Sequence, residues 1–264
     1  MGKIKIICDW DLDVNIESDK NIELWVDQNP NLEKDPGTIR IGLLIEPEEI
    51  RRSLGLVTFL DRFDYILTHN KDIINSRGNA FLYEFGGCWV KDYGFGNKEF
   101  GVSTLIGGKN LAQGHVIRTN LFKRNGEIKI PKDVWVSKNF PPVNPGNHHV
   151  LTGTKSSMFD KQFHIVIENV KRENWFTEKL MDSLYTKTVP IYYGCPNIGD
   201  WFDTDGFIVA DSVNDIITAC NSLTPDTYNN MIHAVEKNYI ECQKYLNCDE
   251  NIKRSIEKNI LPLI

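Results

Sequence analysis

Short runs of apolar, mostly β-branched residues recur along the chain and alternate with longer amphipathic stretches. The runs occupy residues 3–8, 39–45, 65–68, 102–106, 134–136, 164–167, 189–193 and 207–209. Strands this short and apolar, separated by helical segments, are typical of parallel sheets that are covered on both faces. The pattern therefore predicts an α/β fold with parallel sheets.

The C-terminal part of the chain has helical rather than strand periodicity. Two apolar stripes recur there at helical spacing, namely Ile216, Ile217 and Cys220, and then Ile252, Ile256 and Ile260. A stripe of this kind is the face that an amphipathic helix turns toward a protein core. The sequence thus predicts that the chain ends in helices packed on the rest of the fold.

A glycine-rich region, residues 86–108, separates two halves with similar strand patterns. We place a domain boundary near residue 98, which gives an N-terminal α/β domain, 1–98, and a C-terminal α/β domain, 99–264, that includes the C-terminal helices. In open parallel sheets a ligand lies beyond the carboxyl ends of the strands. Two such halves predict a ligand site in a cleft between them, lined by residues that directly follow strands.

The charge of the chain narrows the classes of ligand. Among 264 residues, 30 Lys and Arg face 36 Asp and Glu, a net charge of −6, whereas a general nucleic-acid binder is expected to be basic. Residues 1–50 hold 12 acidic and 5 basic side chains, but residues 108–138 hold seven basic and two acidic ones. The local excess of positive charge indicates a candidate anion site.

Sequence features that direct a chain to a membrane are weak here. The apolar run after Met1 is too short for a signal peptide. No stretch approaches the roughly 18 apolar residues that span a bilayer. We therefore expect a cytoplasmic protein without a transmembrane segment.

The densest group of polar residues follows the strand at 164–167. Thr177 or Asn174 is a plausible N-cap of the next helix, which puts Glu178 and Lys179 in its first turn. A lysine there opposes the helix dipole, but a bound phosphate would reverse that penalty. Glu178 has acceptor oxygens for a ribose diol. The alternative is an ordinary surface Glu–Lys pair.

Three motifs follow one another in this region and together form a pattern with a fixed order and spacing. They occupy residues 163–169, residues 175–179 and residues 189–194. In order and spacing they resemble the signature of the α1,3/4-fucosyltransferases, glycosyltransferase family 10. The resemblance implies two Rossmann-like domains facing a cleft (GT-B architecture), with the acceptor on the N-terminal side. It also implies an inverting transfer of L-fucose from GDP-β-L-fucose to a glycan hydroxyl, forming an α1,3 or α1,4 linkage.

The same resemblance implies roles for individual residues. The donor would be bound by Asn169, Trp175, Thr177, Glu178 and Lys179, with Lys179 on the pyrophosphate, Glu178 on the ribose, and Asn169 and Trp175 lining the nucleotide pocket. Trp175 replaces the Tyr that is usual in the family.

Two further segments resemble the family outside these motifs. The segment Gly114–Phe122 resembles the family's arginine segment and makes Arg118 the second phosphate ligand, inside the basic stretch found by counting charges. The segment Leu43–Pro47 resembles the region that carries the catalytic base, which implies Glu46. Ile45 stands where the family often has Gly, and Glu84 is the fallback candidate for the base.

The chemistry of an inverting sugar transfer is consistent with these residues. One carboxylate takes the proton of the acceptor hydroxyl, and cations stabilise the charge that develops on the leaving diphosphate. Arg118 and Lys179 can supply that positive charge, so we expect no obligatory divalent metal and no cofactor besides the co-substrate GDP-fucose. A competing signal is the D-x-D pattern in Asp9–Asp13, which metal-dependent sugar transferases use.

Two other functions remain compatible with the sequence. One is an inverting GT-B transferase that uses a different nucleotide sugar, and the other is a non-catalytic module that binds a glycan or a nucleotide. Phe85, Trp89 and Tyr93 could stack on an acceptor sugar, although most aromatic residues at such spacing belong to a core. The expected partners are GDP-fucose and an oligosaccharide acceptor, as in soluble bacterial or viral members of the family.

Overall fold

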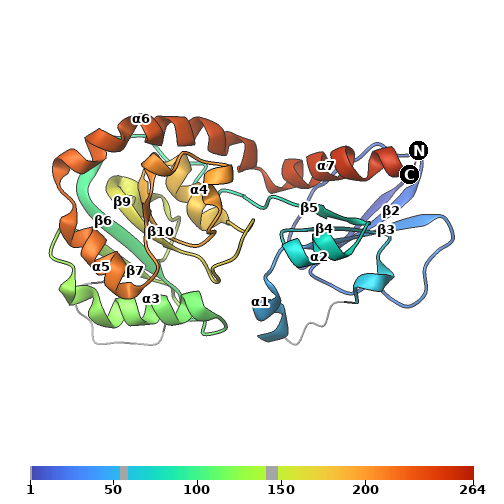
Figure 1. The fold of residues 1–264 in the computed structure, drawn as a ribbon, viewed down its shortest axis with the longest axis horizontal. Helices are drawn as coiled ribbons and strands as arrows, with labels where there is room; N and C mark the ends of the chain where they lie inside the picture. The colour runs from blue at the N-terminus through green and yellow to red at the C-terminus, as the bar shows by residue number, and fades with distance from the viewer. Residues whose placement is uncertain (1, 54–58, 141–147) are drawn as a thin grey trace. The chain divides into compact units, whose positions relative to one another are not determined.

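The computed structural model describes residues 2–53, 59–140 and 148–264. Its contacts divide the chain into two compact units. Unit 1 contains Met1–Phe85, Glu173–Trp175 and Asn247–Ile264, and unit 2 contains Gly86–Arg172 and Phe176–Leu246. Each unit holds one parallel sheet with its own core (Figure 1).

The sheet of unit 1 has five parallel strands in sequence order, β1-β2-β3-β4-β5. The strands are β1 (Ile4–Ile7), β2 (Asn21–Val26), β3 (Thr38–Leu44), β4 (Tyr65–Thr68) and β5 (Ala80–Leu82), and the helices are α1 (Glu48–Ser53), α2 (Lys71–Ser76) and α7 (Cys248–Asn259). Helix α7 places its isoleucine stripe against one face of this sheet. The other face packs with Phe63 and, from α2, Ile73.

The sheet of unit 2 has six parallel strands in the order β11-β10-β9-β6-β7-β8. Its strands are β6 (Glu99–Ile106), β7 (Lys132–Val136), β8 (His149–Val150), β9 (Lys161–Ile167), β10 (Val189–Tyr193) and β11 (Ile208–Val209). This is the strand order of the Rossmann fold, in which the chain reverses direction across the sheet between the first and fourth strands. In unit 2 that switch point lies between β6 and β9.

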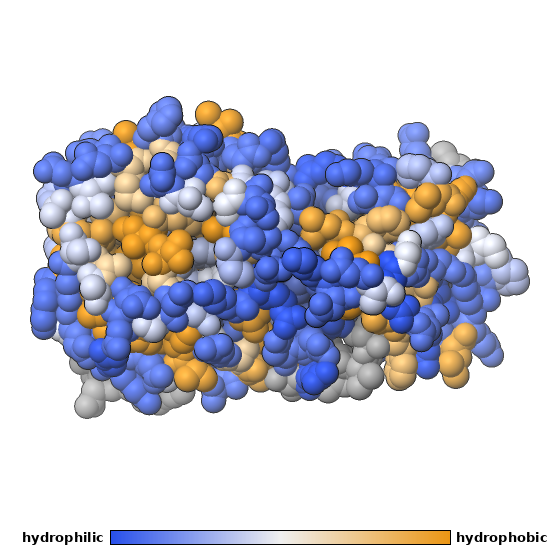
Figure 2. Space-filling view, viewed as in Figure 1, coloured by the Kyte–Doolittle hydropathy of each residue, from blue (hydrophilic) through white to orange (hydrophobic). Residues whose placement is uncertain are grey.

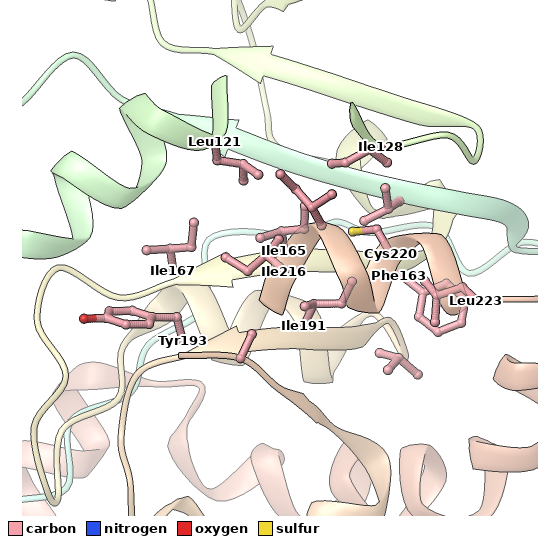
Figure 3. Close-up of a cluster of buried hydrophobic side chains, with 14 of the residues drawn as sticks. Leu121, Ile128, Phe163, Ile165, Ile167, Ile191, Tyr193, Ile216, Cys220 and Leu223 are labelled. Carbon is pink, nitrogen blue, oxygen red and sulfur yellow. The ribbon is translucent and has the colours of Figure 1, made fainter. Parts of the chain in front are cut away.

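Helices cover both faces of the second sheet (Figure 1). They are α3 (Gln113–Arg124), α4 (Glu178–Tyr185), α5 (Val213–Ser222) and α6 (Pro225–Cys242). Leu121 of α3 and Ile216 of α5 pack with strand residues such as Ile165 and Ile191 on one face (Figure 3). On the other face, Leu180 of α4 packs with Cys242 of α6 and with strand residues.

The structure confirms the predicted fold class and most of its strands. Each of the eight apolar runs overlaps a strand, and both apolar stripes are buried on helices. The missed strands are β2, β5 and β8. Strand β2 contains the polar residues Asn21 and Glu23, which hide its apolar character, and β5 and β8 are only three and two residues long.

The division of the chain differs from the predicted boundary near residue 98. Residues 86–98 pack on unit 2, where Cys88, Val90 and Tyr93 join a core with Met158 and Phe159. Helix α7, which we expected in the C-terminal domain, joins unit 1 instead. The reason is that the chain leaves unit 1 and returns to it, which local sequence patterns do not reveal.

The face of the molecule shown in Figure 2 is mainly hydrophilic, with several separate hydrophobic areas. In the view of Figure 2, hydrophilic residues cover most of the surface and separate the hydrophobic areas. Among the described residues, no helix is both long enough and apolar enough to cross a membrane.

The placement of α7 can be tested at Ile256, which is fully buried in the core of unit 1. We expect Ile256→Ala to lower the free energy of unfolding by about 2–5 kcal/mol, because it leaves a cavity. Urea denaturation measures the change, and Glu257→Ala on the exposed side of α7 is the matched control. Equal stabilities of the two variants would contradict the packing of α7.

Candidate functional site

The candidate site lies at the carboxyl edge of the second sheet, beside its switch point. Strands β6 and β9 are parallel neighbours, so the segments that follow them start at the same edge. The chain after β6 leads into α3, and the chain after β9 leads through Glu168 and Asn169 toward α4. Both helices therefore begin at this edge.

Glu168 connects the end of β9 to the start of α4. Its carboxyl group is fully buried and accepts two hydrogen bonds from Thr177, one from the backbone N–H at 2.9 Å and one from the hydroxyl at 2.8 Å. Of the two predicted candidates, Thr177 and Asn174, Thr177 is the N-cap of α4, and its Oγ1 accepts the N–H of Lys179 at 3.3 Å. Burial raises the pKa of Glu168.

Lys179 lies among the acceptors at the start of α4. Its Nζ is 2.8 Å from Glu178 Oε1, 3.1 Å from Thr177 Oγ1 and 3.8 Å from Glu168 Oε2. Burial opposes ionisation of Glu178, but Lys179 and Lys155 lower its pKa to about 2. Burial likewise opposes the charge on Lys179, but Glu178 and Glu168 raise the pKa of its ammonium. The Glu178–Lys179 pair is therefore charged at neutral pH.

Arg118 approaches the same place from α3. It is only 7% exposed, and its guanidinium donates to Asn169 Oδ1 at 3.0 Å and to the carbonyl of Ile167. Burial lowers its pKa to about 10, against the opposing effect of Glu168 and Glu178, so it stays protonated at neutral pH. Both acceptors of these hydrogen bonds are neutral, so among the described residues no carboxylate is hydrogen-bonded to the Arg118 guanidinium.

The close packing of α3 on the end of β9 requires a glycine. A Cβ at Gly114 would lie 1.8 Å from the carbonyl oxygen of Glu168. The N–H of Gly114 also donates to the carbonyl of Asn169 at 2.9 Å. Gly114 thereby lets α3 bring Arg118 to the switch point.

His115 stabilises the start of α3 and was not predicted to belong to this site. Its Nδ1 accepts the backbone N–H groups of Leu111 at 3.3 Å and Ala112 at 3.1 Å. Burial, together with the cations Arg118 and Lys109, lowers the pKa of His115 to about 4. The imidazole is therefore neutral at pH 7, and its two hydrogen bonds hold the end of the loop that follows β6.

A second, partly buried ion pair lies one helical turn further along α4. Lys155 Nζ is 3.2 Å from Asp182 Oδ2, and Asp182 Oδ1 accepts the N–H of Trp89 at 2.7 Å. The Lys155 ammonium lies 4.1 Å from the centre of the Trp89 ring. Of the three aromatic residues singled out in the sequence, Tyr93 is buried, whereas Trp89 is 64% exposed. No local motif marks Lys155 or Asp182.

Glu46, the predicted base, directly follows Ile45 in the loop after β3 in unit 1. The backbone N–H of Glu46 donates to Asp27 Oδ2 at 3.0 Å, and its carbonyl accepts from Arg51 Nε at 3.1 Å. The fallback, Glu84, also belongs to unit 1. The structure thus groups both candidate bases in one unit and the predicted phosphate ligands in the other.

Trp175 does not lie with the other residues that were predicted to bind the donor. It is 1% exposed, belongs to unit 1 by its contacts, and donates from Nε1 to the carbonyl of Ile45 at 3.0 Å. Its ring centre lies 6.1 Å from that of His69. The structure therefore groups Trp175 with the Glu46 loop, whereas Arg118, Asn169, Thr177, Glu178 and Lys179 lie together in unit 2. Its role in donor binding stays a prediction.

The acidic residues of the D-x-D pattern follow β1. There Asp9 Oδ1 accepts a hydrogen bond from Gln28 Nε2 at 2.8 Å. Across residues 2–53, 59–140 and 148–264, no group of three or more His, Cys, Asp or Glu side chains could hold a metal ion. Metal independence of the reaction stays a prediction.

Comparison with solved structures identifies the fold. An α1,3-fucosyltransferase with GDP-fucose matches at a TM-score of 0.56 and 11% identity, covering 90% of this chain and 78% of that one. A trehalose-6-phosphate protein from E. coli bound with UDP-2-fluoro glucose matches at a TM-score of 0.59 and 8% identity, covering 94% and 74%. The chain therefore has the α/β fold of GT-B glycosyltransferases such as α1,3-fucosyltransferase, which confirms the predicted fold class and the resemblance at the level of fold.

Sequence comparison adds a local match to another group of fucosyltransferases. The chain is 33% identical over 82 residues to GDP-fucose protein O-fucosyltransferase 3 of Xenopus laevis, and 37% identical over 59 residues to the protein of the same name from Xenopus tropicalis. The matches cover 30% and 19% of this chain but only 16% and 12% of those proteins. No protein-family model matches the chain.

The link between β9 and α4 can be tested at Thr177. We expect Thr177→Val to lower the free energy of unfolding by about 1–3 kcal/mol, because the N-cap and a hydrogen bond to the buried Glu168 are both lost. Thr177→Ser keeps the hydroxyl and should stay close to the wild type. Urea denaturation compares the three proteins, and a valine variant as stable as the serine variant would contradict the role of this hydroxyl.

Proposed function

We propose that the protein is an inverting fucosyltransferase that transfers L-fucose from GDP-β-L-fucose to a hydroxyl of an acceptor glycan, forming an α1,3 or α1,4 linkage. The observation that carries the proposal is the meeting of Arg118 and Lys179 at the switch point of the second sheet. The fold of α1,3-fucosyltransferase, including a structure with GDP-fucose, and the local similarity to protein O-fucosyltransferase 3 both support this donor.

In the proposed complex the diphosphate of GDP lies against Arg118 and Lys179. A guanidinium presents a planar fork of N–H donors that fits phosphate oxygens, and Lys179 adds a second positive charge. The N-termini of α3 and α4 begin at the same edge, and their dipoles favour an anion there. Glu178 accepts hydroxyl groups of the ribose, while Asn169 and Thr177 complete the donor-binding set.

The reaction is a single displacement at the anomeric carbon. The acceptor oxygen forms a bond to that carbon while the bond to the β-phosphate oxygen breaks, and the electron pair leaves with GDP. Glu46 takes the proton of the acceptor hydroxyl. Arg118 and Lys179 stabilise the charge that develops on GDP, so the proposed chemistry needs no divalent ion.

The phosphate roles predict a specific loss of nucleotide affinity. We expect Arg118→Ala and Lys179→Ala each to weaken GDP binding by at least about tenfold, because each removes a charge-assisted hydrogen bond. Isothermal titration calorimetry with GDP measures the effect. Arg124→Ala is the matched control, since Arg124 lies exposed at the end of α3 and pairs with Glu127. GDP affinity unchanged in the Arg118 and Lys179 variants would rule out their phosphate roles.

If Glu46 is the base, replacing it should reduce turnover without reducing nucleotide affinity. Glu46→Gln should lower turnover by about 10²-fold or more while leaving GDP affinity nearly unchanged, because the amide cannot accept the proton. GDP release from GDP-fucose, measured with a panel of oligosaccharide acceptors, gives the turnover. Wild-type turnover in this variant would move the role to Glu84, which the same assay tests with Glu84→Gln.

A transferase with another nucleotide sugar is the second candidate, because the fold also matches structures with UDP-linked glucose donors. A donor panel containing GDP-fucose, other GDP-sugars and UDP-glucose separates the two. Transfer from GDP-fucose alone, undiminished by EDTA, is the expected result. Transfer from another donor would replace fucose, loss of transfer with EDTA would support the metal reading of Asp9–Asp13, and GDP binding without transfer from any donor would indicate a binding module.

A further inference from the structure

An aspartate that the sequence motifs do not mark follows the unpredicted strand β2. Asp27 has a left-handed backbone with φ of 49°, a conformation uncommon for residues other than glycine but tolerated by Asp and Asn. Its N–H still donates to the carbonyl of Leu43 at 2.9 Å, so it remains paired with β3. The turn directs its side chain toward the segment that follows β3.

The carboxyl group of Asp27 holds the backbone of the predicted base. Its Oδ1 accepts the N–H of Ile45 at 3.0 Å, and its Oδ2 accepts the N–H of Glu46 at 3.0 Å. The same loop is held from other directions by Arg51, on the carbonyl of Glu46, and by Trp175, on the carbonyl of Ile45. The backbone of Ile45 and Glu46 is thus held by these three side chains, and among the three only Asp27 is acidic.

The buried carboxyl group of Asp27 holds its proton more tightly than an exposed aspartate does. Burial raises its pKa to about 7; Glu46 adds to this increase, and the bound N–H groups and Arg51 oppose it. The Cys8 thiol, after β1, also interacts with it, and burial raises the pKa of that thiol. Asp27 and Glu46 are therefore two neighbouring carboxyl groups whose charges influence each other.

Structural support alone does not explain a carboxylate at this position. An asparagine would also tolerate the left-handed backbone, and an oxygen in the place of Oδ1 would still lie 3.0 Å from the N–H of Ile45 and 3.2 Å from that of Glu46. Only the bond of Oδ2 to the N–H of Glu46 would be lost, because an NH2 group cannot accept it. Besides this second acceptor oxygen, the ionised carboxylate provides negative charge beside Glu46. A negative neighbour increases the proton affinity of a carboxylate, which brings a weak base closer to the strength useful at neutral pH.

We propose that Asp27 is a positioning residue for Glu46: it fixes the backbone that carries the base, and its negative charge strengthens that base. The inference rests on the proposed function, in which Glu46 accepts the proton of the acceptor hydroxyl. Asp27 touches neither substrate in this account. It acts through Glu46.

The kinetic test uses Asp27→Asn, which keeps the size and the backbone preference of the residue but removes the charge. We expect kcat at pH 8, where Asp27 is ionised, to fall by about tenfold, with unchanged KM for GDP-fucose and unchanged GDP affinity. In the wild type, kcat should rise as the pH passes through about 7, where Asp27 ionises, and this rise should be absent in the variant. Asp72→Asn, at an exposed site on α2, is the matched control. A variant with wild-type kcat and pH profile would overturn the proposal.

A stability measurement separates this role from simple structural support. The pKa of Asp27 is raised from 3.8 to about 7, so the stability that it contributes is present below pH 4 and is lost as the pH rises through 7. Asp27→Asn lacks that loss, so in thermal denaturation its stability relative to the wild type should increase between pH 5 and pH 8.5. A relative stability that is the same at pH 5 and at pH 8.5 would show that Asp27 does not become charged over this range, and would overturn the proposal.

Failure of this inference and failure of the proposed function give different results. If the wild type releases no GDP with any acceptor, the proposed function falls and the role of Asp27 falls with it. If the wild type is active and Glu46→Gln is not, but Asp27→Asn matches the wild type, only the role of Asp27 is overturned.

Discussion

The candidate donor site depends on one buried group, the carboxyl of Glu168, which binds both the N–H and the hydroxyl of Thr177. These two bonds fix where α4 starts relative to the end of β9. Since Glu178 and Lys179 occupy the first turn of α4, their positions follow from that start. Gly114 of α3 packs closely against the backbone of Glu168 and Asn169. The direction of α3, and with it the position of Arg118, therefore depends on the same segment.

The two cations at this site, Lys179 and Arg118, differ in whether a carboxylate lies directly beside them. Lys179 lies between Glu178 and Glu168, whereas the hydrogen bonds of Arg118 go to the amide of Asn169 and the carbonyl of Ile167. A buried cation with neutral acceptors is costly unless further negative charge arrives. Burial lowers the pKa of Arg118 to about 10, and in the proposed complex the diphosphate of GDP supplies negative charge beside it.

The sequence predicted the features that local patterns determine. Apolar runs identified eight strands, and the polar oxygen of Thr177 before a helical stripe identified the N-cap of α4. The patterns could not show where distant segments pack. The return of α7 to unit 1 and the burial of Trp175 beside Ile45 depend on contacts between residues far apart in the chain. Asp27 was missed because β2 was missed, and β2 was missed because Asn21 and Glu23 interrupt its apolar residues.

The central claim is that Arg118 and Lys179 bind the diphosphate of the donor, and a crystal structure of the protein with GDP tests it most directly. The account predicts phosphate oxygens within hydrogen-bond distance of the Arg118 guanidinium and the Lys179 ammonium, at the carboxyl edge of β6 and β9. Phosphates bound elsewhere, for example through a divalent ion at Asp9–Asp13, with Arg118 still directed only at Asn169 and Ile167, would contradict it.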